Sequence, residues 1–313
     1  MLRYKIPLLY FLVCGLIAWN LFLTFRAATH QQVIGTVVED EPGVIQAANW
    51  MNNPTGLFEV PNKIDFAGEK VPLDIPDVFE RFEREIYVNA YWQSNMILLM
   101  KRAGKYLPTI ESILAKHGIP DDFKYVAIAE SGLMNVSSPA GARGFWQLME
   151  GTAKDYKLEI SPDVDERYHL EKSTEAACKF LKWAHAKYGN WTNVAAGYNM
   201  GVAGLARRMN EQNLNTYYDL LLYDETSRYV FRVVAIKEIF ENPARYGFHL
   251  NENDFYKAPL MRELVVDQSI SNLSDWAITH NSNYKELKLY NPWLRSSRLT
   301  VKGNNQYTIK LPV

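Results

Sequence analysis

The stretch VAIAESGLMNVSSPAGARGFWQLM, residues 126–149, places one acidic residue, Glu130, inside an otherwise apolar helical run. Positions three, four and seven apart lie on one face of a helix, so Glu130 shares its face with Phe123 and Val126. Because those neighbours favour burial, the carboxyl is drawn toward the core with them. An unpaired buried carboxylate is costly, so its pKa rises and the group stays protonated. A protonated carboxyl in a half-buried wall is what a general acid requires near neutral pH.

The composition is that of an ordinary globular protein with no excess of basic charge. The 313 residues suffice for one large or two modest domains. The formal net charge is −1, which lacks the basic surplus typical of nucleic-acid binding. We therefore expect no nucleic-acid partner.

The N-terminus has the pattern of a membrane segment. Arg3 and Lys5 precede an uncharged, apolar run at residues 6–25. About twenty residues at about 1.5 Å each match a bilayer core of roughly 30 Å. Basic residues before the run favour an N-terminus that stays inside while the rest is exported. We expect residues 1–28 to be an uncleaved signal anchor; a cleaved signal peptide, followed by a soluble product, is the alternative.

The cysteines and histidines give no sign of a disulfide framework or a metal site. Cys14 lies within the apolar N-terminal run and Cys178 in a distant helical pattern. The six histidines are scattered, with no pair at metal-ligand spacing. We expect neither a metal nor a cofactor.

The chain after the N-terminal segment divides by pattern into a spacer and a helical region. Residues 29–73 mix Pro, Gly and polar residues, as a spacer with a short strand or two does. Residues 74–250 are helical in pattern, with few β signals. The first expected helices lie at 77–103 with a break at Gly104, 106–117 ending at Gly118, and 120–130 closed by Gly132. Further helices are expected at 145–156, at 173–188 beginning at a Ser173 cap, and in the stretches 190–211 and 225–242, which complete the helical set.

Residues 258–313 form a second, smaller unit. Residues 261–269 and 306–313 are strand-like, and residues 270–281 and 283–292 predict two short helices between them. Strand, helix, helix, strand in about fifty residues is a small α+β module. The fold class expected for the whole chain is mainly α, with this α+β module at the C-terminal end.

Four sequence blocks in the helical region form a recognisable set. They are AESG (129–132), SPAGARGFWQLM (138–149), DERYHLEKSTEAACKFL (165–181) and GNWTNVAAGYNMG (189–201). In this order and spacing they resemble the lytic transglycosylase family, most of all its membrane-bound D type, from about residue 74 to 250. The resemblance implies a lysozyme-like, all-helical catalytic domain with a sugar-binding groove. Met200 departs from the family pattern, which has Ala at this position.

The C-terminal unit is similar to a LysM module, which binds chains of N-acetylglucosamine. It departs from the usual LysM pattern after its first strand, where DQSIS (267–271) replaces a glycine-bearing turn. Together the two resemblances imply peptidoglycan glycan strands as the partner. With the predicted anchor, they place the chain in the cell envelope, facing the periplasm.

The resemblance implies a reaction with a single carboxyl group. The family cleaves the β-1,4 bond between N-acetylmuramic acid and N-acetylglucosamine and forms a 1,6-anhydromuramic end without using water. Glu130 would protonate the leaving oxygen and then accept the proton of the muramic 6-hydroxyl.

The resemblance also assigns substrate-binding roles, each beside a structural alternative. Ser131 and Ser138 would approach the acid, although they suit a helix end and a turn equally well. Gln147 and Met149 would line the groove, although Met149 alone suggests core. The Tyr198 hydroxyl would lie near Glu130 with Asn199 beside it, although both suit a helix junction between glycines.

Two other functions remain open at this point. A goose-type lysozyme-like hydrolase would cleave the same bond with water and would need further carboxylates in the groove. A membrane-tethered, non-catalytic scaffold would bind peptidoglycan without cutting it.

Overall fold

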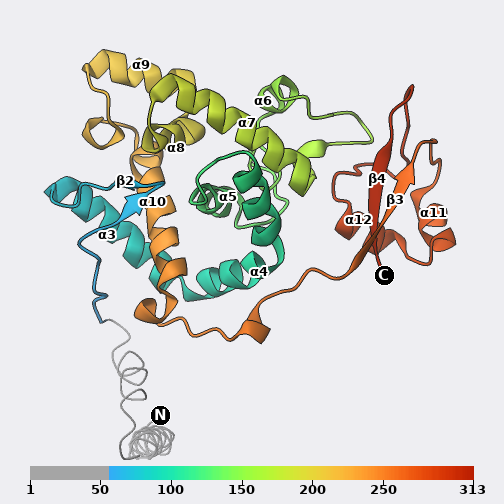
Figure 1. The fold of residues 1–313 in the computed structure, drawn as a ribbon, viewed down its shortest axis with the longest axis horizontal. Helices are drawn as coiled ribbons and strands as arrows, with labels where there is room; N and C mark the ends of the chain where they lie inside the picture. The colour runs from blue at the N-terminus through green and yellow to red at the C-terminus, as the bar shows by residue number, and fades with distance from the viewer. Residues whose placement is uncertain (1–55) are drawn as a thin grey trace, which may run out of the picture. The chain divides into compact units, whose positions relative to one another are not determined.

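Helices form most of residues 56–313, the part of the chain that the computed structural model describes (Figure 1). The predicted anchor at residues 1–28 and the first part of the predicted spacer lie outside the described residues. Within residues 56–313, no helix combines the length and apolar character needed to cross a bilayer.

Eight helices and a short hairpin make up the larger, helical part. The hairpin strands are β1 (Asp65–Phe66) and β2 (Glu69–Lys70). The helices are α3 (Pro76–Tyr91), α4 (Gln93–Lys116), α5 (Phe123–Ser131), α6 (Glu150–Asp155), α7 (Leu170–Tyr188), α8 (Trp191–Met200), α9 (Val202–Gln212) and α10 (Asp224–Glu241). Four short 3₁₀ helices lie at Glu166–Tyr168, Tyr217–Asp219, Pro243–Tyr246 and Glu252–Asp254.

Helix α5, which carries Glu130, packs against α4 and α10 in the middle of the helical part (Figure 1). Its side chains Phe123, Val126 and Ala127 are fully buried, as the apolar pattern predicts. The helix ends where predicted, at Gly132, whose φ of 59° is left-handed and suits glycine. The position of Glu130 is therefore fixed by a buried helix with a defined end.

The break between the first two helices falls at Trp92, and the predicted break at Gly104 is wrong. Gly104 lies inside α4. A Cβ on Gly104 would lie only 2.7 Å from the Phe255 Cβ, so glycine is needed there for close packing. The main chain of Tyr256 also donates to the Lys101 carbonyl at 2.8 Å, which holds this segment against α4.

Other helix boundaries also differ from the predicted ones. Helix α7 begins at Leu170, three residues before Ser173, and the Ser173 hydroxyl donates to the Leu170 carbonyl at 3.2 Å rather than capping the helix. Residues 145–149 belong to a loop, in which Gln147 has a φ of 45°, and only Glu150–Asp155 are helical. Helix α7 is thus longer than predicted, whereas at residues 145–149 the tertiary structure overrides the helical pattern.

The end of the predicted spacer packs onto the helical part through the β1–β2 hairpin. Phe66 and Val71 are buried in the main core. The Glu69 carboxylate accepts hydrogen bonds from the main chain of Trp191 at 2.6 Å and of Thr192 at 2.8 Å. A carboxylate at the N-terminus of a helix satisfies free amides and complements the helix dipole, so Glu69 stabilises the start of α8.

The C-terminal module has the predicted order of strand, helix, helix, strand. Its elements are β3 (Met261–Val266), α11 (Leu273–Thr279), α12 (Tyr284–Tyr290) and β4 (Tyr307–Pro312). The strands pair antiparallel, with Met261 opposite Pro312 and Val266 opposite Tyr307. The core of this module also includes Val164 and Tyr168 from the helical part.

The close contact at Gly104 predicts that two glycine-to-alanine changes will affect stability differently. Gly104→Ala should lower the free energy of unfolding by about 1–3 kcal/mol, because overpacking against Phe255 outweighs a helix-propensity gain of up to about 1 kcal/mol. The control is Gly151→Ala in α6, where a Cβ meets nothing within 4 Å, and it should be neutral or stabilising. Urea denaturation measures both. Equal behaviour of the two variants would contradict the packing argument.

Candidate active site

Glu130 lies near the C-terminal end of α5 and accepts a hydrogen bond from a tyrosine on α10. The Tyr229 hydroxyl donates to Glu130 Oε1 at 2.6 Å. The Tyr229 side chain is buried, while Glu130 keeps partial exposure. The carboxyl is thus held in one orientation by a rigid donor from a second helix.

Burial raises the pKa of Glu130 to about 7, well above the usual glutamate value. The hydrogen bond from Tyr229 and the charge of Arg232 lower the pKa, but they do not offset the desolvation. Near neutral pH the carboxyl therefore exists in both protonation states. This is the condition in which one group can give a proton and take it back.

Tyr198, on α8, lies close to Glu130 but directs its hydroxyl elsewhere. The hydroxyl donates to the Trp146 carbonyl at 2.5 Å. Burial and the charge of Glu130 raise the Tyr198 pKa well above its usual value. Tyr198 therefore stays neutral and connects α8 to the loop that carries Trp146.

Tyr198, which lies close enough to Glu130 to feel its charge, lines a groove of about 740 Å³ formed by residues 147–149, α6, α7, α8 and the start of α9. Glu130 itself is not among the lining residues. Aromatic side chains at Tyr156, Phe180 and Trp183 line the groove, together with polar and small residues. Flat apolar faces with a few polar groups suit the faces and edges of sugar rings. The volume of this groove is in the range found for small-molecule binding sites in proteins.

The structure brings four of the sequence-predicted substrate-binding residues together in this groove: Gln147, Met149, Tyr198 and Asn199. The side-chain nitrogen of Gln147, Nε2, donates to the Gly144 carbonyl at 2.7 Å and to the Val136 carbonyl at 3.1 Å. The Met149 side chain is 47% exposed. Met200, where the sequence departs from the family pattern, also lines the groove.

Asn199 is held from α10. Its side-chain oxygen accepts a hydrogen bond from the Thr226 hydroxyl at 2.9 Å. Thr226 lies one turn before Tyr229, so the same helix orients both Asn199 and Glu130.

The two predicted serines make local contacts. The buried Ser131 hydroxyl donates to the Ala127 carbonyl at 3.1 Å, one turn back along α5. The Ser138 hydroxyl accepts from the main chain of Ala142 at 3.0 Å and closes the loop after α5. A role for either serine toward the acid stays a prediction.

Tyr229 is the site residue that the sequence analysis missed. It lies at 229, beyond the four motif blocks, in a helix whose buried face includes Thr226, Val230 and Val233. A tyrosine on the buried face of a helix needs a partner for its hydroxyl. That signal marks Tyr229 as a buried hydrogen-bond donor, but only the packing of α10 on α5 identifies Glu130 as its acceptor.

Metal ligation has no support in the part of the chain that the structure describes. Among residues 56–313, no three His, Cys, Asp or Glu side chains are placed to hold a metal ion.

Comparison with protein families matches two regions. Residues 109–220 match the transglycosylase SLT domain. Residues 262–313 match the soluble lytic transglycosylase C-terminal LysM-like domain. Glu130 and the four predicted residues that line the groove lie within the first match, whereas Tyr229 lies after its end.

Among characterised proteins, the chain is similar to membrane-bound lytic murein transglycosylase D of Escherichia coli K12. The two are 24% identical over 290 residues, which is 90% of this chain and 63% of the relative. This chain thus spans less than two thirds of that relative's length.

Two solved structures are also partly similar. The 70 kDa soluble lytic transglycosylase of Escherichia coli matches with 19% identity and a TM-score of 0.39, over 49% of this chain and 26% of its own. An inactive mutant of the lytic transglycosylase Slt of Pseudomonas aeruginosa matches with 18% identity and a TM-score of 0.35, over 44% and 24%. The chain therefore contains a transglycosylase SLT domain at residues 109–220 and a LysM-like domain at residues 262–313, and it is homologous to membrane-bound lytic murein transglycosylase D.

Proposed function

We propose that the chain is a peptidoglycan lytic transglycosylase. It cleaves the β-1,4 bond between N-acetylmuramic acid and N-acetylglucosamine and leaves a 1,6-anhydromuramic end. The observation that carries this proposal is the Glu130 carboxyl, whose pKa lies near 7 and which lies close to Tyr198, a residue of the aromatic groove. The SLT match and the homology to a lytic murein transglycosylase support the same activity.

One carboxyl group suffices for the whole proposed reaction. Protonated Glu130 gives its proton to the glycosidic oxygen as the bond from that oxygen to the muramic anomeric carbon breaks. The muramic 6-hydroxyl then attacks the anomeric carbon, and the Glu130 carboxylate accepts the hydroxyl proton. Glu130 returns to its starting state and no water is consumed. Glycosidases that use water instead need a second carboxyl group, roughly 5–9.5 Å from the first.

Tyr229 supports both halves of this cycle. Its hydroxyl donates to Oε1, so it orients the carboxyl and stabilises the carboxylate formed by the first proton transfer. Without that hydrogen bond, the desolvated carboxylate would be a poor product of the first step. The positive charge of Arg232 stabilises the Glu130 carboxylate as well.

A hydrolase that uses water is the alternative for the same bond. Among the groove-lining residues described, Asp155 is the acidic side chain, and it is exposed. Glu225 is near enough to affect Glu130, but its carboxylate pairs with Arg232 at 3.4 Å. This arrangement favours the internal 6-hydroxyl over a water positioned by a free carboxylate.

We also propose the surroundings in which the enzyme works. Residues 1–28 would anchor it in the membrane, residues 29–73 would form a spacer, and the domains at 74–250 and 258–313 would face the cell wall from the periplasm. The apolar run at residues 6–25 and the homology to a membrane-bound murein transglycosylase support this placement. The LysM-like module would supply a second, weak contact with glycan strands.

The carboxyl of Glu130 predicts a pH-dependent stability difference. The folded-state pKa of about 7 exceeds the usual value of 4.5, so ionisation costs stability as pH rises from 4.5 to 7. Glu130→Gln, which has no charge to bury, should unfold like wild type at pH 4. At pH 8 it should be more stable by about 1–3 kcal/mol. Denaturant titrations at both pH values measure this; equal stability at pH 8 would contradict the raised pKa.

The same variant tests the reaction. Glu130→Gln should reduce murein turnover at least about 100-fold, because general acid–base catalysis contributes about 10²–10⁴-fold and glutamine cannot cycle a proton. Its stability at pH 8 serves as the folding control. Activity above about a tenth of wild type would exclude Glu130 as the acid.

Mass spectrometry of the released fragments separates the three candidate functions. A transglycosylase leaves anhydro ends, which are lighter by one water than the reducing ends that a hydrolase leaves. A scaffold binds sacculi and releases no soluble fragments. We expect anhydro ends from wild type.

The hydrogen bond from Tyr229 predicts a shift in the pH profile. Because this bond lowers the Glu130 pKa, Tyr229→Phe should move the alkaline limb of kcat/KM from near pH 7 upward by about one unit. Tyr198→Phe is the matched control, since its hydroxyl bonds to the Trp146 carbonyl, and it should leave the limb in place. If the alkaline limb of kcat/KM does not move in Tyr229→Phe, the hydrogen bond from Tyr229 to Glu130 is refuted.

A further inference from the structure

Residues 159–168, here called the docking segment, lie between the helical part and the LysM-like module. Val164 forms a β-bridge with Leu294 of the module. The Asp165 amide donates to the Trp293 carbonyl at 2.9 Å, and the Arg295 amide donates to the Asp163 carbonyl at 2.7 Å. The module is therefore joined to the docking segment by main-chain hydrogen bonds, which fix orientation more strictly than apolar contact alone.

The Asp163 side chain makes the densest contact with the module. Its carboxylate is buried and accepts from the Thr300 hydroxyl at 2.6 Å, the Thr300 amide at 3.2 Å and the Ser296 hydroxyl at 2.8 Å. Arg298 pairs with it at 3.5 Å. Burial raises the Asp163 pKa, but the bonds from Thr300 and Ser296 outweigh burial and lower it overall. All of these partners belong to the module.

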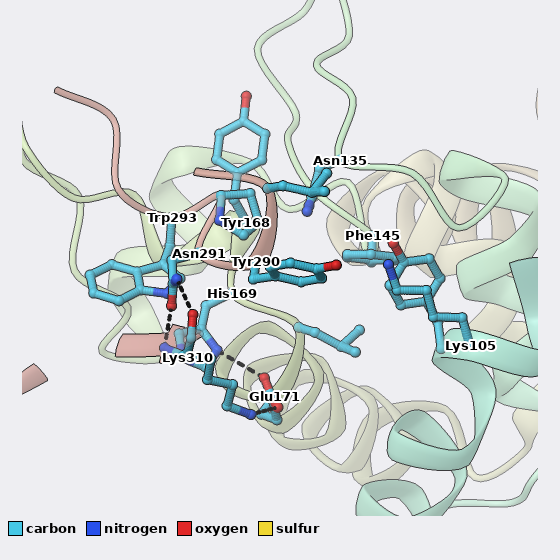
Figure 2. A pocket seen from close by; sticks show the side chains of 14 residues that line it. Lys105, Asn135, Phe145, Tyr168, His169, Glu171, Tyr290, Asn291, Trp293 and Lys310 are labelled. Atoms are coloured by element: carbon cyan, nitrogen blue, oxygen red, sulfur yellow. Dashed lines mark hydrogen bonds and ion pairs between the residues drawn. The ribbon is translucent and has the colours of Figure 1, made fainter. Parts of the chain in front are cut away.

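Further contacts surround this one. The Tyr307 hydroxyl donates to Glu159 at 2.8 Å, and Lys310 pairs with Glu171 at the start of α7. Figure 2 shows the small pocket, of about 120 Å³, that both parts line here, with Lys310 and His169 directed at Glu171. The contact between the two parts thus has the buried Asp163 carboxylate at its centre, with further hydrogen bonds and ion pairs around it.

The opposite side of the docking segment contacts the loop at residues 137–148. Arg167 is buried and forms two hydrogen bonds with Asp165, at 2.8 and 2.9 Å. The third nitrogen of its guanidinium group, Nη1, donates to the carbonyls of Gly141 at 3.1 Å and Leu148 at 3.4 Å. Gly144 lies so close that a Cβ would be 1.9 Å from the Arg167 carbonyl. The loop and the docking segment therefore cannot move independently at this point.

The same loop forms one wall of the candidate active site. Gln147 and Leu148 line the groove, and the Trp146 carbonyl accepts the Tyr198 hydroxyl. Hydrogen bonds between Arg143 and Leu148, in both directions at 3.2 Å, keep the loop folded on itself.

We propose that Asp163 is a positioning residue, through which the LysM-like module holds the loop at residues 137–148 in its active geometry. The path runs from Thr300 and Ser296 to Asp163, along the docking segment to Arg167, and from there to the loop carbonyls. The module then contributes to turnover as well as to any glycan binding of its own. This inference rests on the proposed lytic activity, but the loop geometry can also be measured without it.

The test uses the full chain in detergent and two docking variants. Asp163→Ala removes the contacts that the Asp163 carboxylate makes with Ser296, Arg298 and Thr300. Thr300→Val removes one hydroxyl at an exposed position, where the fold should tolerate it. The matched control is Asp275→Ala, an exposed carboxylate of the same module whose hydrogen-bond partners lie within the module. Each is assayed on a short soluble glycan that cannot engage two sites at once.

We expect kcat for Asp163→Ala to fall by about 10-fold or more with KM within about twofold, since a misplacement of about 1 Å can cost about 10²-fold. Thr300→Val should lower kcat less, in the same direction, and Asp275→Ala should leave it unchanged. Unchanged kcat in both docking variants, or a change in KM alone, would overturn the proposal.

Hydrogen exchange supplies the readout that does not need activity. The amides of Ser138 and Leu148 donate hydrogen bonds within the loop, and the Gly144 amide donates to the carbonyl of Val136, just before it. In Asp163→Ala they should exchange about tenfold faster or more, while amides in α3 and α10 keep their wild-type rates. Unchanged loop exchange would overturn the proposal even if activity fell. An inactive wild type with the expected exchange pattern would refute the proposed activity and leave the positioning intact.

Discussion

The hydrogen bond between Tyr229 and the desolvated Glu130 carboxyl is the interaction on which the rest of the site depends. Burial alone would keep the carboxyl protonated, and solvent exposure would keep it ionised. Its position at the end of α5, with one donor from α10, balances these tendencies and brings the pKa to about 7. The packing of α5 against α4 and α10 is therefore a chemical requirement as well as a structural one.

The order and type of the helices could be predicted from sequence, because apolar periodicity and terminal glycines are local signals. Gly132 closes α5 as expected, and the four elements of the C-terminal module appear in the predicted order. The predictions failed where a distant segment decides the local structure. Gly104 suggests a break, yet it lies inside α4, and the glycine is there because Phe255 packs against it from 151 positions away. No local pattern carries that information.

The candidate site divides in the same way. Glu130 could be found from its place in an apolar stripe, and motif resemblance identified Gln147, Met149, Tyr198 and Asn199, which do meet in one groove. Tyr229 could not be assigned, since its role depends on how α10 crosses α5. The docking segment shows the same limit: the block at residues 165–181 was recognisable as a motif, but its contacts with both the loop and the module emerge only from packing.

The central claim is that Glu130 changes its protonation state near neutral pH, and a direct titration of this carboxyl tests it most directly. Infrared difference spectra of wild type and Glu130→Gln, recorded from pH 3 to 9, isolate the carboxyl and carboxylate bands of this one residue. The account predicts a titration midpoint near pH 7. A midpoint near 4.5, the value of an ordinary glutamate, would contradict it.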